Sequence, residues 1–154
     1  MRRVIALSAV VATVLGLLVV PAAAVSTPLR VTIEDTAQIA AGTGDFVATG
    51  QAVAAGVMCS SGTTAVTSST RTDLSPNWAL LRIRKIAECD DGSGMFNIRM
   101  NVLLNVSTGE TFALWRFRAG TGSYTSLAGV GVLVGTPIVQ GVSVLDVYRG
   151  RVRA

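Results

Sequence analysis

The sequence predicts an all-β protein built as a single closed antiparallel barrel of eight strands. Apolar and polar residues alternate along several segments, which is the period of a half-buried strand. Helix signals are scarce, whereas glycine (16 residues), threonine, serine and valine are abundant. The expected strands are joined by short turns rather than crossover helices, and closure would remove their exposed edges. A β-sandwich is the alternative fold.

Residues 1–24 have the pattern of a cleaved signal peptide. Two arginines precede an apolar run over residues 4–20, and Ala24 fits the small residue before a signal-peptidase cleavage site. We therefore expect a secreted protein in which residues 25–154 form one barrel domain.

The charge and residue types exclude several kinds of function. Removing Arg2 and Arg3 with the signal peptide lowers the formal net charge from +4 to +2, too little to predict a nucleic-acid partner. No later apolar run is long enough for a membrane span. The chain has no histidine, which excludes Ser-His-Asp and Cys-His catalysis and histidine metal ligation. We predict no catalytic residues, no metal and no cofactor.

The clearest expected strand covers residues 96–106. Apolar residues occupy every second position of it, and three asparagines and Arg99 lie between them. A turn at 107–110 leads to a hairpin partner at 111–118, in which Trp115 faces the interior.

The other strands have weaker patterns. Residues 78–88 alternate until Lys85, where we expect a bulge. Residues 73–78 are expected to form a loop because Pro76 cannot donate to a ladder, and 35–41 either one helical turn or a loop. The remaining expected strands are 29–34, 46–58, 63–70, 124–134 and 141–153.

Cys59 and Cys89 are the only cysteines of the chain. In an exported protein, such a pair predicts a disulfide rather than a metal site. A closed loop of about 31 residues would contribute roughly 3–4 kcal/mol by the chain-entropy model. The alternative is two free thiols on strands that keep them apart.

A short glycine motif occurs three times and raises the possibility of a phosphate-binding loop. Each copy has two glycines around one residue and an aromatic residue two positions later; the glycines are Gly42, Gly44, Gly92, Gly94, Gly120 and Gly122. Phosphate loops require a following helix or a Gly-Lys-Ser/Thr sequence, but each copy leads into a strand and Lys85 lies elsewhere. We interpret the motif as a structural turn whose aromatic residue seals one end of the barrel.

The third copy also carries a family resemblance. The segment "GTGSYTSLAGVGVLVGTP" at 120–137 resembles the Gly-Thr-Gly-x-Phe/Tyr segment of allene oxide cyclase and dirigent proteins, and more closely small secreted bacterial proteins built on that barrel. The matching residues are Gly120, Thr121, Gly122, Tyr124 and Gly129. The resemblance implies an eight-stranded barrel with an apolar interior that can form a homo-oligomer, and it carries over no active-site residue.

The charged residues of the expected strands predict a basic surface. Five arginines alternate with apolar residues on three strands and are expected to face outward: Arg82, Arg84, Arg99, Arg116 and Arg118. Such a face could attract an anionic polymer or a lipid surface, but charges also keep a barrel exterior soluble. We expect Glu110 and Asp146 to be exposed.

These observations predict a secreted barrel that binds a small apolar ligand or interacts through its surface. The alternative is an enzyme that steers a reactive intermediate inside the barrel, as the resemblance implies. A cavity of several hundred Å³ with one or two converging polar groups would favour ligand binding or catalysis. If side chains fill the interior completely, surface interaction is the only one of these functions that remains.

Overall fold

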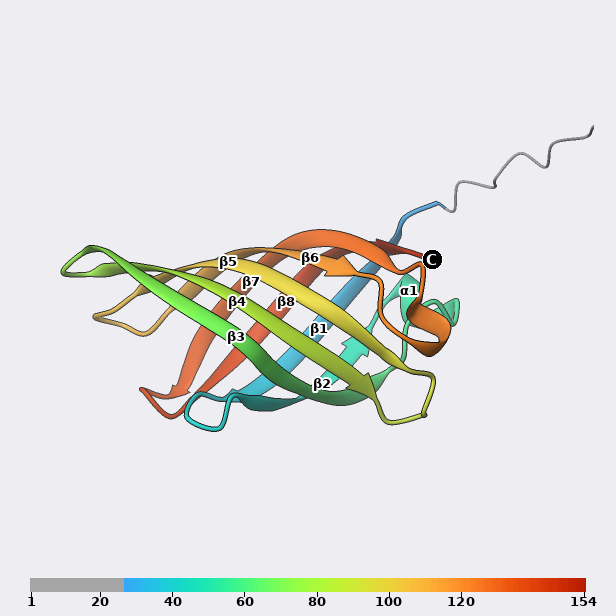
Figure 1. Cartoon of the computed structure of the whole chain (residues 1–154), viewed down its shortest axis with the longest axis horizontal. Coiled ribbons are helices and arrows are strands. Elements are labelled where there is room, and N and C mark those ends of the chain that lie inside the picture. Colours follow the sequence, from blue (N-terminus) through green and yellow to red (C-terminus); the bar gives the residue numbers. More distant parts are fainter. Residues whose placement is uncertain (1–26) are drawn as a thin grey trace, which may run out of the picture.

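The computed structural model describes residues 27–154, which form a closed barrel of eight antiparallel strands (Figure 1). The strands follow one another around the barrel in chain order, and β1 pairs with β8 to close it. The predicted barrel is therefore confirmed in place of the sandwich. The predicted signal peptide lies outside the described residues. The strands are β1 (Leu29–Gln38), β2 (Thr43–Thr49), β3 (Ser61–Ser75), β4 (Trp78–Cys89), β5 (Met95–Asn105), β6 (Thr111–Arg118), β7 (Ala128–Val139) and β8 (Ser143–Arg153).

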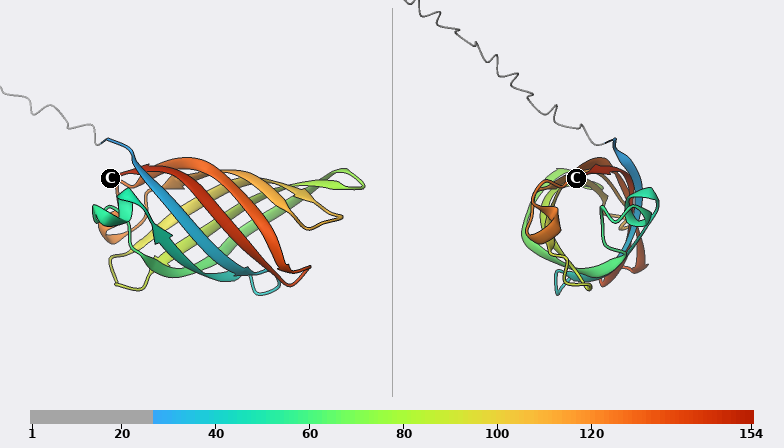
Figure 2. Two further views of the ribbon diagram at one scale, coloured as in Figure 1. Left: turned by 180° about the vertical axis from the view of Figure 1, so that it is seen from behind. Right: turned by 90° about the vertical axis from the view of Figure 1, so that its right-hand side faces the viewer.

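The two ends of the barrel are built from different connections (Figure 2). One end, which we call the stapled end, carries the C-terminus, the short helices α1 (Gln51–Ala54) and η1 (Gly122–Tyr124), and the connections 50–60, 90–94 and 119–127. The other end, which we call the cavity end, carries the turns at 39–42, 76–77, 106–110 and 140–142. Within residues 27–154, no helix is long and apolar enough to cross a membrane.

Aromatic side chains fill the barrel interior toward the stapled end. The Phe96 ring lies 4.9 Å from Phe117, 5.5 Å from Tyr124 and 6.2 Å from Phe46, measured between centroids. Phe117 in turn stacks on Trp115 at 4.4 Å. Edge and tilted contacts of this kind stabilise a core beyond the area that the rings bury.

Trp115 fits in this core because two glycines face it. A Cβ atom at either Gly131 or Gly150 would collide with the Trp115 indole, so these positions must remain without a side chain. The indole Nε1–H also donates a hydrogen bond of 2.8 Å to the Val132 carbonyl oxygen. The glycines of β7 and β8 therefore permit a large ring inside a narrow barrel.

Two strand boundaries near the N-terminal part differ from the prediction. The expected strand 46–58 ends at Thr49, because Gly50 adopts a φ of 106° and the chain turns into α1. The segment 35–41 is neither a helical turn nor a loop over most of its length, because β1 continues to Gln38.

Two further boundaries were also wrong. The expected loop at 73–78 is strand on both sides of a two-residue turn, since β3 reaches Ser75 and β4 begins at Trp78. Pro76 lies in that turn, where no ladder hydrogen bond is needed. The strand expected from residue 124 begins only at Ala128, because η1 precedes it.

Candidate functional site

A cluster of polar side chains lies inside the barrel between the aromatic core and the cavity end. The Lys85 ammonium donates hydrogen bonds to Asp35 Oδ2 (2.8 Å), Asp146 Oδ2 (3.3 Å) and Tyr148 OH (3.3 Å). Thr64 Oγ1 donates to Asp35 Oδ1 at 3.1 Å. These five residues, which we call the lysine cluster, come from four strands and are all buried.

The sequence folds this way because each charged residue occupies an inward position of its strand. In β4 the residues Leu81, Ile83, Lys85 and Ala87 alternate with outward ones, so the period continues through the lysine. The predicted bulge lies on the facing strand, where Val66 pairs with Lys85 and Ser68 with Arg84. Thr67 is therefore the extra residue of the bulge.

Asp146 was expected to be exposed, and the structure corrects this. It is only 8% exposed and points into the barrel from β8. Ionised carboxylates are rarely buried without a partner, and here Lys85 supplies one at 3.3 Å. Glu110, by contrast, is exposed as predicted.

Two glycines create the space for the carboxylates. A Cβ atom at Gly44 would collide with Asp35 Oδ1, and one at Gly135 would collide with Thr111 Oγ1 and crowd Asp146 Oδ1. Gly44 belongs to the first copy of the glycine motif and has no positive φ. Its role is therefore to make room for the lysine cluster rather than to form a turn.

Burial and neighbouring charges together raise the pKa values of three members of the lysine cluster. Burial alone would lower the pKa of Lys85, but its interactions with Tyr148, Asp35 and Asp146 raise that pKa above its ordinary value of 10.5. Burial raises the pKa of Asp146, an effect that Lys85 opposes and Asp35 reinforces. Burial also raises the pKa of Tyr148, so its phenol is neutral at ordinary pH. Two carboxyl groups thus share one ammonium group.

A cavity of about 280 Å³ lies beside the lysine cluster in the half of the barrel toward the cavity end. Most of its lining is apolar and includes Ala37, Val66, Leu81, Ile83, Met100, Val102, Leu104, Leu133 and Val144. Thr64, Lys85 and Asp146 line it as well. Thr111 Oγ1 is a further lining atom, buried and without a hydrogen-bond partner among the described residues.

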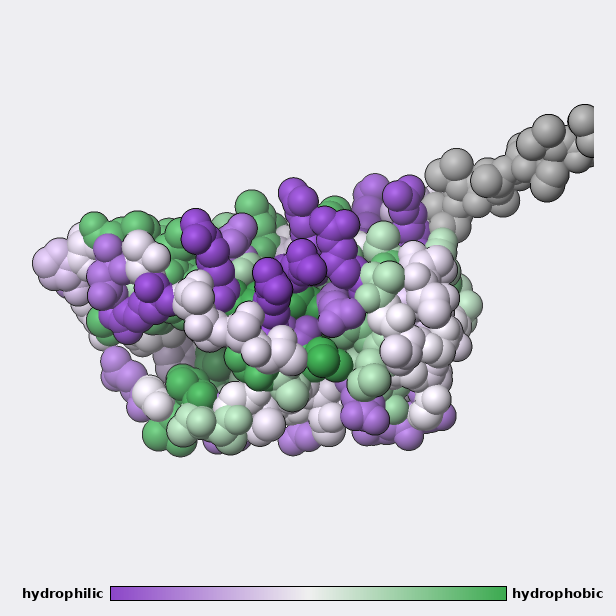
Figure 3. Space-filling view, viewed as in Figure 1, coloured by the Kyte–Doolittle hydropathy of each residue, from purple (hydrophilic) through white to green (hydrophobic). Residues whose placement is uncertain are grey.

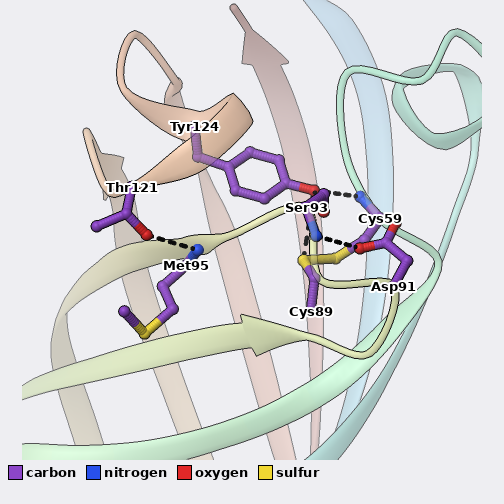
Figure 4. The surroundings of a disulfide bond; sticks show 7 residues. All are labelled: Cys59, Cys89, Asp91, Ser93, Met95, Thr121 and Tyr124. Atoms are coloured by element: carbon purple, nitrogen blue, oxygen red, sulfur yellow. Dashed lines mark hydrogen bonds between the residues drawn. A yellow bond between two sulfur atoms is a disulfide. The ribbon is translucent and has the colours of Figure 1, made fainter.

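The stapled end is closed by the predicted disulfide between Cys59 and Cys89, whose Cα atoms lie 6.0 Å apart (Figure 4). Tyr124 OH accepts a hydrogen bond from the Cys59 N–H (3.1 Å) and lies 2.7 Å from Ser93 Oγ. One tyrosine therefore connects the disulfide, the β4–β5 turn and the η1 segment.

Two copies of the glycine motif meet at this end. The Thr121 N–H donates to the Met95 carbonyl at 2.8 Å, and the Ser123 N–H donates to the Ser93 carbonyl at 2.9 Å. A Cβ atom at Gly94 or Gly122 would collide with the backbone of the other copy. These two copies are paired turns, whereas the first copy begins in the turn before β2 at the cavity end and continues into that strand.

The five predicted arginines lie on the outer face of three neighbouring strands, β4, β5 and β6. They are therefore separated from the cavity by the barrel wall, because residues such as Ile83 and Met100 on the same strands face inward and line it. Within residues 27–154, no group of three or more His, Cys, Asp or Glu side chains is arranged to hold a metal ion.

The fold and this site define a closed eight-stranded barrel with a mainly apolar cavity beside a buried Lys–Asp–Asp cluster. Comparison with protein-family models, curated proteins and solved structures found no match for the chain. The residues of the site are therefore what indicates its chemistry.

None of the charged members of this site was predicted from the sequence, although the strand pattern contains a signal for them. Extending the alternation of Val31 and Ile33 by one step places Asp35 on the inward face of β1. The same step from Ile83 places Lys85 inward. Opposite charges at inward positions of different strands are expected to pair, since an unpaired buried charge is costly.

Proposed function

We propose that the barrel binds a small, mainly apolar ligand in the cavity beside the lysine cluster. The supporting observation is the cavity of about 280 Å³, whose apolar lining converges on a few polar groups. This size is just below the range of roughly 300–1,000 Å³ that is typical of ligand pockets. The ligand is therefore compact, on the scale of a medium-chain alcohol or a monocyclic compound.

The polar groups of the cavity favour a ligand that donates a hydrogen bond. All three protons of the Lys85 ammonium already have acceptors within the lysine cluster. Thr111 Oγ1 lies beside Gly135, as Asp146 Oδ1 does, and it has no hydrogen-bond donor or other partner among the described residues. A hydroxyl or amine of the ligand supplies that donor.

Calorimetric titration with hexanol, octanol and decanol tests the proposal on the purified protein. We expect saturable binding of at least one alcohol. Leu104 lines the cavity, so Leu104→Trp should fill it and abolish binding. The matched control is Leu103→Trp. Leu103 immediately precedes Leu104 in the same strand, but its side chain lies on the outside of the barrel and is 37% exposed.

Two results would overturn the proposal. The first is the absence of binding by all three alcohols to the natural protein. The second is an equal loss of binding in both tryptophan variants, which would place the alcohol outside the cavity. Circular dichroism spectra that match the natural protein would show that the variants are folded.

A second candidate is an enzyme that steers a reactive intermediate inside the barrel. The observation in its favour is that ionisable groups, Lys85 and Asp146, line the apolar cavity. Mass spectrometry of the alcohols recovered after incubation distinguishes the two functions. Unchanged alcohol supports binding alone, and a chemically altered product supports catalysis.

The proposed place of action is outside the cell. The Cys59–Cys89 disulfide is compatible with an oxidising compartment. Mass analysis of the protein from culture medium tests this, with cleavage after Ala24 as the expected result. A mass that includes residues 1–24, or its recovery only from cell lysate, would contradict it.

A further inference from the structure

The outer surface of β4, β5 and β6 carries a concentration of positive charge. We call it the arginine face, and it consists of Arg82, Arg84, Arg99, Arg116 and Arg118, all exposed. Figure 3 shows hydrophilic side chains gathered over these strands.

The register of the strands places three of these arginines in one row. Arg99 is the direct partner of Arg84 on one side and of Arg116 on the other. Neighbouring strands are about 4.8 Å apart, and like charges directly opposite one another destabilise a sheet. The row therefore costs stability unless another group neutralises it.

The side-chain carboxylates of the described part of the barrel do not supply such a group. Among residues 27–154, no side-chain carboxylate lies within salt-bridge distance of the arginine face, and Arg71–Asp73 is the outer pair that does form. The acids nearest in the chain, Glu88 and Glu110, lie at a strand end and in a turn. A surface built for solubility alone intersperses both signs, whereas this one separates them.

A groove of about 790 Å³ runs over the arginine face. All five arginines line it, together with uncharged hydrogen-bonding side chains, namely Ser68, Thr70 and Asn101. Its lining includes one aromatic residue, Trp115, which is only 1% exposed and therefore offers no ring for stacking.

We propose that the arginine face binds a linear acidic polysaccharide. Guanidinium groups pair with carboxylate or sulfate oxygens through two parallel hydrogen bonds. The serine, threonine and asparagine side chains match the hydroxyl groups of the sugars between the charges. Single-stranded nucleic acid fits less well, because its binding sites use exposed aromatic rings for base stacking. This surface lies outside the barrel and does not depend on a ligand in the cavity.

Biolayer interferometry with immobilised polygalacturonate and heparin tests the proposal, with neutral dextran as the reference polymer. We expect binding to an acidic polymer, none to dextran, and weakening at high salt because exposed charges are screened. Arg99→Gln/Arg116→Gln should weaken binding by roughly tenfold or more, since it removes two charge-assisted contacts.

The matched control is Arg30→Gln/Arg149→Gln, which removes the same charge from β1 and β8, outside the groove. We expect its affinity to change by less than about threefold, the scale of a general charge effect at the surface. Arg84→Gln/Arg118→Gln is a second test within the groove if the first variant does not fold.

Three results would overturn the proposal. Equal losses in the groove and control variants would show that net charge alone is responsible. Binding to dextran as tight as to the acidic polymers would remove the role of the arginines. Tighter binding of single-stranded DNA than of either acidic polysaccharide would assign the surface to nucleic acid.

Discussion

The stapled end and the cavity end of the barrel use the same eight strands to opposite effect. Toward the stapled end, aromatic rings from β2, β5 and β6 fill the interior, and the Cys59–Cys89 disulfide joins the α1 connection to β4. Toward the cavity end, aliphatic side chains leave about 280 Å³ unfilled. The lysine cluster lies between these two halves.

This difference shows that a barrel whose strands are closed can still have an interior that side chains do not fill. Apolar alternation brings the strands together, but ring size and cross-linking decide which half becomes solid. The cavity end also exposes apolar side chains, among them Ile39, Leu74 and Ile138, and the outer part of β3 beyond Val66 is exposed. Stability is thus concentrated at one end, and space for a ligand at the other.

Loss of the lysine cluster should have the largest effect, because the cluster joins the two halves. Lys85→Met leaves Asp35 and Asp146 buried without their cation. Removing one partner of a buried ion pair typically costs about 3–5 kcal/mol. Urea unfolding monitored by tryptophan fluorescence measures this loss, and a loss below about 1 kcal/mol would contradict the ionic role.

Removal of the disulfide should destabilise the stapled end by nearly as much. The two cysteines are 30 residues apart in the chain, so Cys59→Ala/Cys89→Ala should lower the free energy of unfolding by about 3–4 kcal/mol. Reduction of the natural protein with dithiothreitol should give a similar loss in urea unfolding. Octanol binding at 25 °C, where the variant is folded, should be unchanged. A variant that is folded but no longer binds octanol would show that the two ends are not independent.

The Tyr124 hydroxyl should contribute a smaller part of the stability of the same end. Tyr124→Phe keeps the ring against Phe96 but removes the acceptor of the Cys59 N–H. We expect a loss of about 1–2 kcal/mol, the cost of an unsatisfied buried donor. Ile39→Ala is the control at the cavity end, where Ile39 is 54% exposed; we expect a change within about 0.5 kcal/mol. Equal losses in both variants would contradict the contrast between the ends.

The smallest expected effect is a dependence of stability on pH at the boundary between the halves. Because burial raises the pKa of Asp146, the folded protein binds more protons than the unfolded chain above the ordinary pKa of 3.8. The free energy of unfolding should therefore fall as the pH rises from 3.8 through the folded-state pKa.

Asp146→Asn isolates this contribution. The difference in unfolding free energy between the natural protein and the variant, measured by urea unfolding across that window, should decline with rising pH. A difference that instead grows with pH would mean that Lys85 lowers the pKa of Asp146 more than burial raises it.

The fold could be predicted where side-chain chemistry follows the strand period over most of a strand. In β5 and β6 the inward positions are apolar and the arginines and asparagines face outward, so both strands were placed correctly although Leu103, Phe112 and Leu114 also face outward. The prediction failed where the local pattern is interrupted for a three-dimensional reason. Gly50 ends β2 early because the chain turns there into α1, and nothing in the run of small residues after it marks this.

The assumption that predicts the fold correctly also prevents the prediction of the candidate site. A strand is recognised by polar residues that face outward, so Asp35, Lys85 and Asp146 were treated as breaks or as surface residues. Their burial depends on partners 50 and 61 residues away in the chain. Gly44 and Gly135 mark the site only when the facing carboxylates are known.

The pairing of β1 with β8 determines the side of the barrel on which a fusion partner or tether can be attached. Leu29 is the register partner of Val152, so both ends of the barrel chain leave from the stapled side. A tag, tether or fusion partner joined at either terminus holds the protein by its cross-linked base and leaves the opposite rim free. For the same reason, a short linker between the termini would allow circular permutation at a cavity-end turn.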